Sequence, residues 1–192
     1  MKIVSNHSQD HPGDLIEEEP KATLSGITES WWRTKERLAS SQFELMAMTL
    51  LPKPPPSAWG KLAMGRETMT VPGGVFSGSL LNGVIVRNAI TGNYDRREQQ
   101  LHFVADAEML TNDGATIYKT DRGLWRGTAN AIERLIAGEA VADCQYYLIG
   151  ILKFSVTHPR YAWLETGTYL SRGVVEGDAL KISQFQVLEV GR

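Results

Sequence analysis

The sequence predicts a mainly β fold, an antiparallel barrel of about eight or nine strands with an N-terminal helix and one short inserted helix. Two observations favour this class. From Phe43 onward apolar residues recur with a period of two, and turn signals rich in Gly, Pro and Asn separate the short segments. The expected strands are 43–51, 67–71, 75–80, 81–87, 101–110, 115–122, 145–156, 161–172 and 180–190.

Length, charge and cysteine content narrow the class of protein. The 192 residues suit one domain with a tail, and a formal charge of −2 makes nucleic acid an unexpected partner. No apolar run approaches the roughly 18 residues of a membrane helix, and Met1–Ser5 lacks the apolar region of a secretory signal. The one cysteine, Cys144, excludes an internal disulfide and is typical of a reducing compartment, so we expect a cytoplasmic protein.

The N-terminal region differs in composition from the body. Residues 1–22 are polar and acidic and bury too little apolar surface to offset their ordering entropy, so we predict a mobile tail. Residues 23–192 are expected to form one domain. Its first element is a helix over about 28–40, on which Trp31 and Trp32 would pack on the body or plug an open barrel end.

A second helix is expected to interrupt the strands. Asn130 and Glu133 form a potential capping pair at its start, and Gly138 suits a left-handed end. Its apolar stripe would consist of Ile132, Leu135 and Ile136.

Six segments follow one another in a specific order: Val71–Gly78, Leu81–Gly83, Thr111–Tyr118, Arg134–Glu139, Tyr146-Tyr147 and Tyr161–Leu164. In this order they resemble the family catalogued as domain of unknown function 3237, and the similarity covers residues 43–190. The resemblance implies a lipocalin-like, or calycin-like, β-barrel with a small-molecule cavity, found in bacteria and fungi, with no general biochemical activity assigned. Relatives beside natural-product pathways imply cofactor-free isomerisation or cyclisation.

The chain departs from the family pattern in one strand. Val104-Ala-Asp-Ala107 stands where the family tends to carry Asp-x-Arg-Tyr, so an acid replaces a base. If family members act through that arginine, this protein acts on or binds a different molecule.

The turn Asn112-Asp113-Gly114 sets the register of a hairpin. A three-residue loop with Gly114 left-handed pairs Thr111 with Ala115 and therefore places Glu108 opposite Tyr118. One face then carries His102, Asp106, Glu108, Tyr118, Thr120 and Arg122, and the other carries Leu101, Phe103, Ala105, Ala107, Met109 and Ile117.

Two interpretations of these faces stay open. In the first, the apolar face is core and the polar face meets water, as is usual for half-buried antiparallel strands. In the second, the polar face lines the barrel, where burial beside Tyr118 would raise the pKa of a carboxylic acid and suit it to proton transfer. His102 and Asp106 lie about 13 Å apart along the strand, which excludes a Ser–His–Asp-type relay.

The second interpretation leads to a hypothesis of a cofactor-independent isomerase, cyclase or dehydratase for a small, largely apolar metabolite of polyketide or terpenoid type. Asp106 or Glu108 would move the proton, and Tyr118 and His102 would orient polar atoms. Arg122 would bind an anionic group. The substrate-binding wall would contain Trp163 together with Tyr147, Tyr161 and Tyr169.

Two other functions use the same features. The barrel would serve as a non-catalytic carrier of such a ligand, or the chain would be an interaction module. We expect no cofactor because no nucleotide fingerprint is present, and no metal because the four histidines lack ligand spacing. A homo-oligomer is expected, since the apolar strand face and the helices offer more apolar surface than one barrel interior needs.

Overall fold

The computed structural model describes residues 43–64, 68–128 and 130–188. Within these ranges the strands are β1 (Phe43–Pro52), β2 (Met69–Val71), β3 (Val75–Ser77), β4 (Gly83–Asp95), β5 (Gln100–Thr111), β6 (Thr116–Gly127), β7 (Tyr146–Val156), β8 (Tyr169–Glu176) and β9 (Ala179–Val187). The helices in the same ranges are α2 (Pro56–Ala63), α3 (Ala131–Ile136) and the 3₁₀ helices η1 (Asp143–Gln145) and η2 (Pro159–Glu165).

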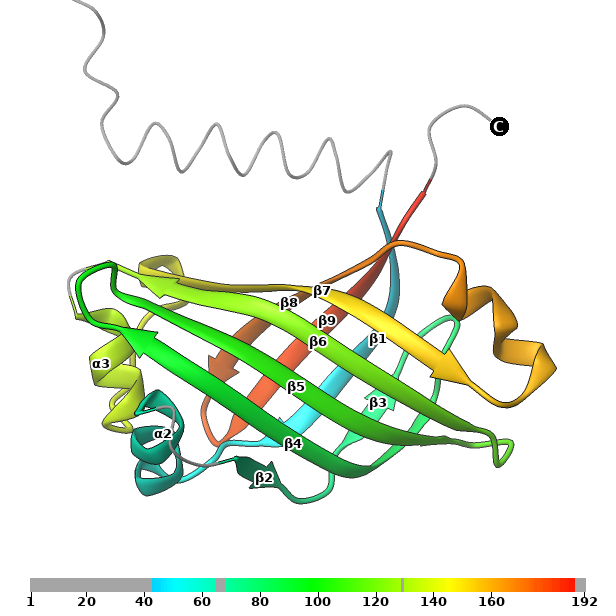
Figure 1. The fold of residues 1–192 in the computed structure, drawn as a ribbon, viewed down its shortest axis with the longest axis horizontal. Coiled ribbons are helices and arrows are strands. Elements are labelled where there is room, and N and C mark those ends of the chain that lie inside the picture. The colour runs from blue at the N-terminus through cyan, green and yellow to red at the C-terminus, as the bar shows by residue number, and fades with distance from the viewer. Residues whose placement is uncertain (1–42, 65–67, 129, 189–192) are drawn as a thin grey trace, which may run out of the picture. The chain divides into compact units, whose positions relative to one another are not determined.

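Eight of these strands close into an antiparallel barrel, as the sequence predicts. Their order is β4-β3-β1-β9-β8-β7-β6-β5, and β5 pairs with β4 to complete the ring. The extra strand β2 pairs with residues 88–90 of β4. The long strands β4 to β7 form one continuous wall of the barrel (Figure 1). Closure pairs the edges of the sheet and directs alternate side chains into the interior.

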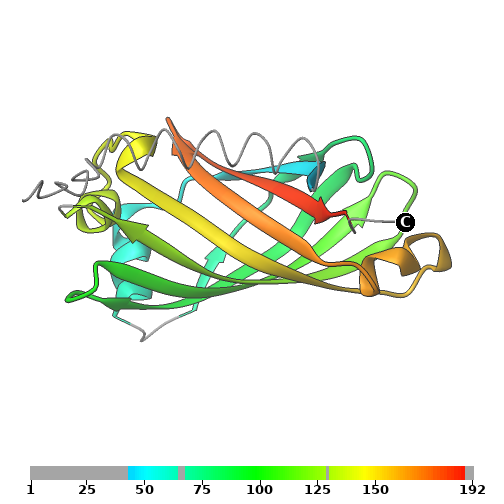
Figure 2. The ribbon, with the colours of Figure 1, turned by 90° about the horizontal axis from the view of Figure 1, so that it is seen from above.

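The helices lie at the two ends of the barrel. Both views show α2 and α3 at one end and η2 at the other (Figures 1 and 2). Trp59 of α2 lies edge-on to Trp125 of β6, with ring centroids 5.0 Å apart, and Leu62 of α2 is fully buried. The amphipathic helix α2 therefore covers the barrel interior at its end.

The predicted hairpin register is confirmed. The Thr111 amide donates to the Ala115 carbonyl, Glu108 lies opposite Tyr118, and Gly114 has a φ of 86°. The prediction followed from turn geometry, because a three-residue loop with a left-handed glycine permits only one pairing of the two strands.

Two local predictions are wrong. Residues 161–172 are not one strand: Pro159 starts η2, in which Tyr161 and Leu164 are buried at a spacing of three, and β8 begins at Tyr169. Residues 91–93, which were expected to form a turn between the strands 81–87 and 101–110, lie inside the longer strand β4. Helix α2 was not expected; Pro56 occupies its first turn, where no amide donor is needed.

The inserted helix is confirmed as α3, with Gly138 left-handed after its end. Its capping is not as expected: the Asn130 side chain makes no capping hydrogen bond, and Glu133 pairs with Arg96 at 3.3 Å.

The predicted tail 1–22 and helix 28–40 lie outside the described residues. In the part of the chain that the structure describes, no helix is both long and apolar enough to cross a membrane.

The Asp113 carboxylate ties η2 to the β5–β6 turn. It accepts hydrogen bonds from the Thr111 hydroxyl, from the Tyr161 hydroxyl at 2.9 Å and from Arg160 Nη1 at 2.9 Å. These partners, the Thr111 hydrogen bond first, lower the pKa of Asp113 below its ordinary value. This end of the barrel is therefore held by polar contacts to one side chain.

Because the pKa of Asp113 is lower in the folded chain than in the unfolded chain, its contribution to stability is present above about pH 4 and is lost as the pH falls through the folded-state pKa. We expect Asp113→Asn to lower the melting temperature at neutral pH and to flatten its fall between about pH 4 and pH 2. Circular dichroism melts measure both effects. Asp178→Asn, in an exposed turn, is the control and should behave like the wild type; an Asp113→Asn variant with an unchanged acid profile would contradict this account.

Candidate functional site

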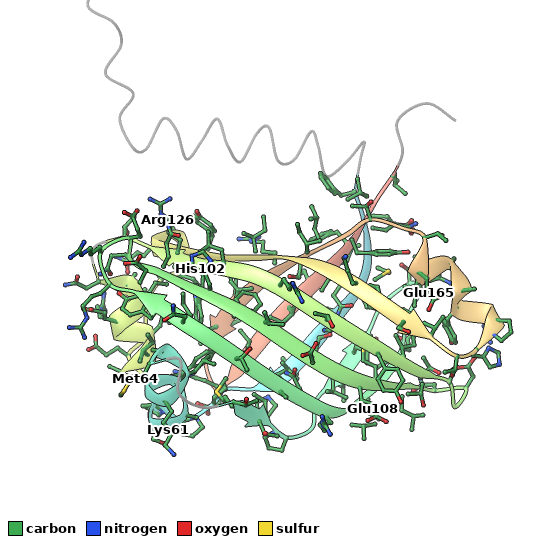
Figure 3. All side chains as sticks on the ribbon, in the orientation of Figure 1. Lys61, Met64, His102, Glu108, Arg126 and Glu165 are labelled. Carbon is green, nitrogen blue, oxygen red and sulfur yellow. The ribbon has the colours of Figure 1, made fainter. Side chains whose placement is uncertain are left out.

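The polar face of the β5–β6 hairpin lies on the outer wall of the barrel. The side chains of His102, Asp106, Tyr118 and Arg122 are exposed, and that of Glu108 is partly exposed. His102 and Glu108 lie towards opposite ends of β5 (Figure 3). Asp106 accepts a hydrogen bond from Thr120 at 2.6 Å, across the strand pair.

The interpretation in which this face lines the barrel is therefore wrong, and the alternative in which it meets water is the one that the structure shows. The opposite face enters the core, where Leu101, Met109 and Ile117 are at most 1% exposed. Burying the apolar face is favourable, and it leaves Asp106, Glu108, Tyr118, His102 and Arg122 in solvent, without the shielding that the proposed proton transfer required.

The predicted aromatic wall is divided among several places. Tyr147 is exposed on the outside of β7. Tyr161 and Tyr169 are buried, but their hydroxyls are engaged in the η2 end, by Asp113 and by the Trp163 carbonyl respectively. Trp163 is partly exposed, and its ring centroid lies 6.2 Å from that of Tyr169. The structure thus brings Tyr161, Trp163 and Tyr169 together at the η2 end, where Tyr161 and Trp163 also line an open surface pocket.

The inner face of β6 carries two charged residues. Lys119 and Asp121 are only 7% and 4% exposed, although they stand on the face that also carries the buried Ile117 and Trp125. They are two residues apart, so their side chains point to the same side of the strand, about 7 Å apart at Cα. Charged side chains are rarely buried unless they are paired, and these two form an opposite-charge pair.

Lys119 and Asp121 line an interior cavity at the α2 end of the barrel. The centre of a water molecule can occupy about 40 Å³ of this cavity, so the cavity has room for a few water molecules. Its wall is otherwise mostly apolar and includes Leu51, Trp59, Leu62, Ile90, Leu101, Phe103, Ala105, Leu148, Leu180 and Ile182, with Asn88 and Trp125 as further polar points.

Two further polar atoms in this wall lack a partner among the described residues. They are Asn88 Oδ1, an acceptor, and Trp125 Nε1, a donor, and both are buried. Asp121 Oδ1, in contrast, accepts a hydrogen bond from the Ser171 hydroxyl at 3.0 Å. The cavity therefore offers a donor, an acceptor and a charge pair within an apolar wall, the composition that is typical of small-molecule sites.

Burial controls the protonation of the pair. Desolvation lowers the pKa of the Lys119 amine, and the Asp121 carboxylate opposes that shift. Desolvation likewise raises the pKa of Asp121, against the attraction of Lys119 and the Ser171 hydrogen bond. Each shift favours the uncharged form of its own group, and the attraction between the two groups opposes both shifts.

A glycine makes room for the Asp121 carboxylate. Gly150 on β7 faces the interior, and a Cβ built there would lie 2.0 Å from Asp121 Oδ1 and 2.7 Å from Ser171 Oγ. Any larger residue would displace the carboxylate or the strand.

Sequence reasoning missed Lys119 and Asp121. The signal was present: in the stripe Ile117, Lys119, Asp121 and Trp125, charges interrupt an apolar face at a period of two. A charge on the face that forms the core indicates a functional residue more strongly than one on the polar face.

Comparison with known proteins places the chain among uncharacterised relatives. The model of the family DUF3237, described as a protein of unknown function, matches residues 43–188. A UPF0311 protein of Rhodopseudomonas palustris (strain TIE-1) is 25% identical over 130 residues, which are 67% of this chain and 85% of that protein.

Solved structures share the fold. A β-barrel-like protein from Acinetobacter baumannii AYE superposes with a TM-score of 0.61 at 24% identity, over 76% of this chain and 95% of that one. A structure described as an enzyme from Penicillium herquei superposes with a TM-score of 0.51 at 16% identity, over 76% and 92% of the two chains. At these identities the likeness establishes the barrel architecture.

The close approach at Gly150 gives a prediction. Gly150→Ala should reduce the free energy of unfolding by about 1–3 kcal/mol, because the new Cβ collides with the Asp121 carboxylate. Asp121→Ala removes the colliding carboxylate, so Gly150→Ala should cost less in the Asp121→Ala background than in the wild type. Urea unfolding of the single and double variants measures the coupling.

Gly60→Ala is the control, since a Cβ in that position of α2 meets nothing within 4 Å; it should stabilise the chain by roughly 0.5–1 kcal/mol. Strictly additive effects of Gly150→Ala and Asp121→Ala would contradict the packing described here.

Proposed function

The chain belongs to the DUF3237 family over residues 43–188, and we propose that it is a small-molecule-binding barrel that transfers a proton on a small, largely apolar ligand without a cofactor. The observation that carries this proposal is the Lys119–Asp121 pair, buried in the wall of an apolar cavity.

The energetics of the pair favour a functional role. Removing two charged groups from water costs several kcal/mol per ion, and their mutual attraction often does no more than offset that cost. Well-packed apolar residues at 119 and 121 would serve the core at least as well. A cost of this kind is expected at a site that binds or transforms a ligand.

The chemistry of the pair is acid–base chemistry. A lowered pKa favours the neutral amine, which can accept a proton, and a raised pKa favours the protonated carboxylic acid, which can donate one. Such a pair suits enolisation, double-bond migration or ring closure of a polyketide- or terpenoid-type molecule, and we propose the isomerase or cyclase class on this ground. That a barrel of the same fold is described as an enzyme is compatible with this class.

The size of the cavity limits how a ligand enters. About 40 Å³ is too small for a metabolite of several rings, so entry requires movement of the side chains that cover it. Trp59 and Leu62 of the eight-residue helix α2 form that cover. We therefore expect ligand binding to displace α2, whereas the η2 end stays tied by Asp113.

A carrier is the second candidate function. It uses the same cavity and differs only in that the ligand emerges unchanged. The homo-oligomer stays a prediction. Its apolar surface would be a row of cross-strand neighbours on the outer wall, each 38–49% exposed: Leu50, Val75, Val84 and Leu110.

Cyclohexanone tests the proton-transfer proposal. We expect the protein to accelerate the exchange of the α-hydrogens of cyclohexanone with D₂O by at least about 100-fold over buffer. An acceleration of this size is in the range that general acid–base catalysis supplies. Proton NMR measures the rate. Lys119→Met should abolish the acceleration, whereas Lys153→Met, on the exposed outer side of β7, should retain it. Binding without exchange would favour the carrier, and equal rates for both variants would refute the role of Lys119.

Stability provides an independent test of why the pair is present. We expect the double variant Lys119→Met/Asp121→Leu to be as stable as the wild type or more stable by about 1–4 kcal/mol, because it removes two buried charges together. Lys119→Met alone should be less stable than the double variant, since it leaves Asp121 without its partner. Urea unfolding measures each, and a double variant less stable than both single variants would indicate that the pair serves the fold.

A further inference from the structure

We propose that Lys119 is a nucleophile whose ε-amine condenses with the carbonyl carbon of an aldehyde or ketone ligand to form an imine. The inference rests on the proposed function, because it uses the same cavity, and it names the ligand class. It extends that function from proton transfer to a covalent step.

The position of Lys119 suits attack on a bound carbonyl. Its cross-strand neighbour on β5 is Ala107, and Asp121 is flanked by Ala105. Two small side chains thus border the pair on β5, of which Ala105 lines the cavity, whereas Phe154 and Leu152 border the pair on β7. The charged group that acts on the Lys119 amine is the Asp121 carboxylate.

The charge balance of the cavity favours a neutral carbonyl over an anion. Lys119 and Asp121 together carry no net charge, so an anionic ligand would leave one uncompensated negative charge in an apolar interior, at a high desolvation cost. An aldehyde or ketone adds no charge.

The condensation balances with the groups present. The neutral amine adds to the carbonyl carbon, and the oxygen takes a proton from the Asp121 carboxylic acid. The nitrogen then returns a proton to the carboxylate. Asp121 protonates the hydroxyl, water leaves, and a protonated imine forms beside the Asp121 carboxylate. One neutral amine, one carbonyl and one carboxylic acid thus yield one iminium ion, one carboxylate and one water, and the net charge stays zero throughout.

The other described lysines differ in their surroundings. Lys61 and Lys153 are exposed, Lys181 pairs with Glu176, and Lys53 donates to the Gly138 carbonyl. None of these four lines the cavity. Lys119 combines burial, an apolar wall and a neighbouring acid, which is the environment in which a lysine amine becomes nucleophilic at neutral pH.

Reductive trapping tests the proposal. The full chain is incubated with benzaldehyde and sodium cyanoborohydride at neutral pH, and intact-mass spectrometry with peptide mapping locates the added benzyl group. We expect one benzyl group at Lys119 before the exposed lysines react. Lys119→Met should lose this fast label, and Lys153→Met should keep it.

Asp121→Asn keeps the amine and removes the acid, so it should slow labelling at Lys119 by about tenfold or more. This arm also covers the case in which Lys119→Met fails to fold, which circular dichroism reports. Labelling that is slower at Lys119 than at Lys153 in the wild type, or unaffected by Asp121→Asn, would overturn the imine proposal.

The trapping result and the cyclohexanone result separate the two proposals. Lys119-dependent deuterium exchange without trapping would leave acid–base catalysis in place and refute the imine. Trapping at Lys119 without exchange would support the imine and refute the isomerase class. If neither occurs, both proposals fail.

Discussion

Closing an antiparallel sheet into a barrel decides, residue by residue, which side chains face the interior. Along β6 the alternation of side chains places Lys119 and Asp121 in a mostly apolar core that contains few polar groups. Residues on the three neighbouring strands accommodate these two side chains. Ser171 on β8 donates to Asp121, Gly150 on β7 leaves space for the carboxylate, and small alanines on β5 leave space beside the amine.

The two ends of the barrel differ in how they are closed. At the η2 end, Asp113 joins a hairpin turn to a helix through two side-chain donors of that helix, Arg160 and Tyr161. At the other end, the short helix α2 covers the cavity by apolar contact of Trp59 and Leu62. Apolar contact is non-directional, so α2 can shift with a smaller loss of specific interactions than η2 can. The molecule thus combines one end fixed by directional hydrogen bonds with one end closed by apolar contact.

Sequence reasoning predicted the barrel and the register of the β5–β6 hairpin, because period-two alternation and Gly114 each carry a direct geometric meaning. It could not predict which face turned inward, since alternation defines two faces without orienting them. Attention to the polar face led to Asp106 and Glu108, which lie outside. The two charged residues on the apolar face, Lys119 and Asp121, are the ones that line the interior cavity. The helix η2 was missed because its aromatic residues resemble those of a strand.

The central claim is that Lys119 is buried beside Asp121 in a low-dielectric interior. Its most direct test is an NMR titration of the protein labelled with ¹³C at the lysine Cε, with the Lys119 resonance assigned by its loss in Lys119→Met. The account predicts a pKa for Lys119 below the ordinary 10.5, and a different value in Asp121→Asn. A Lys119 resonance that titrates at 10.5 in both proteins would show an amine in contact with water, and would contradict the site described here.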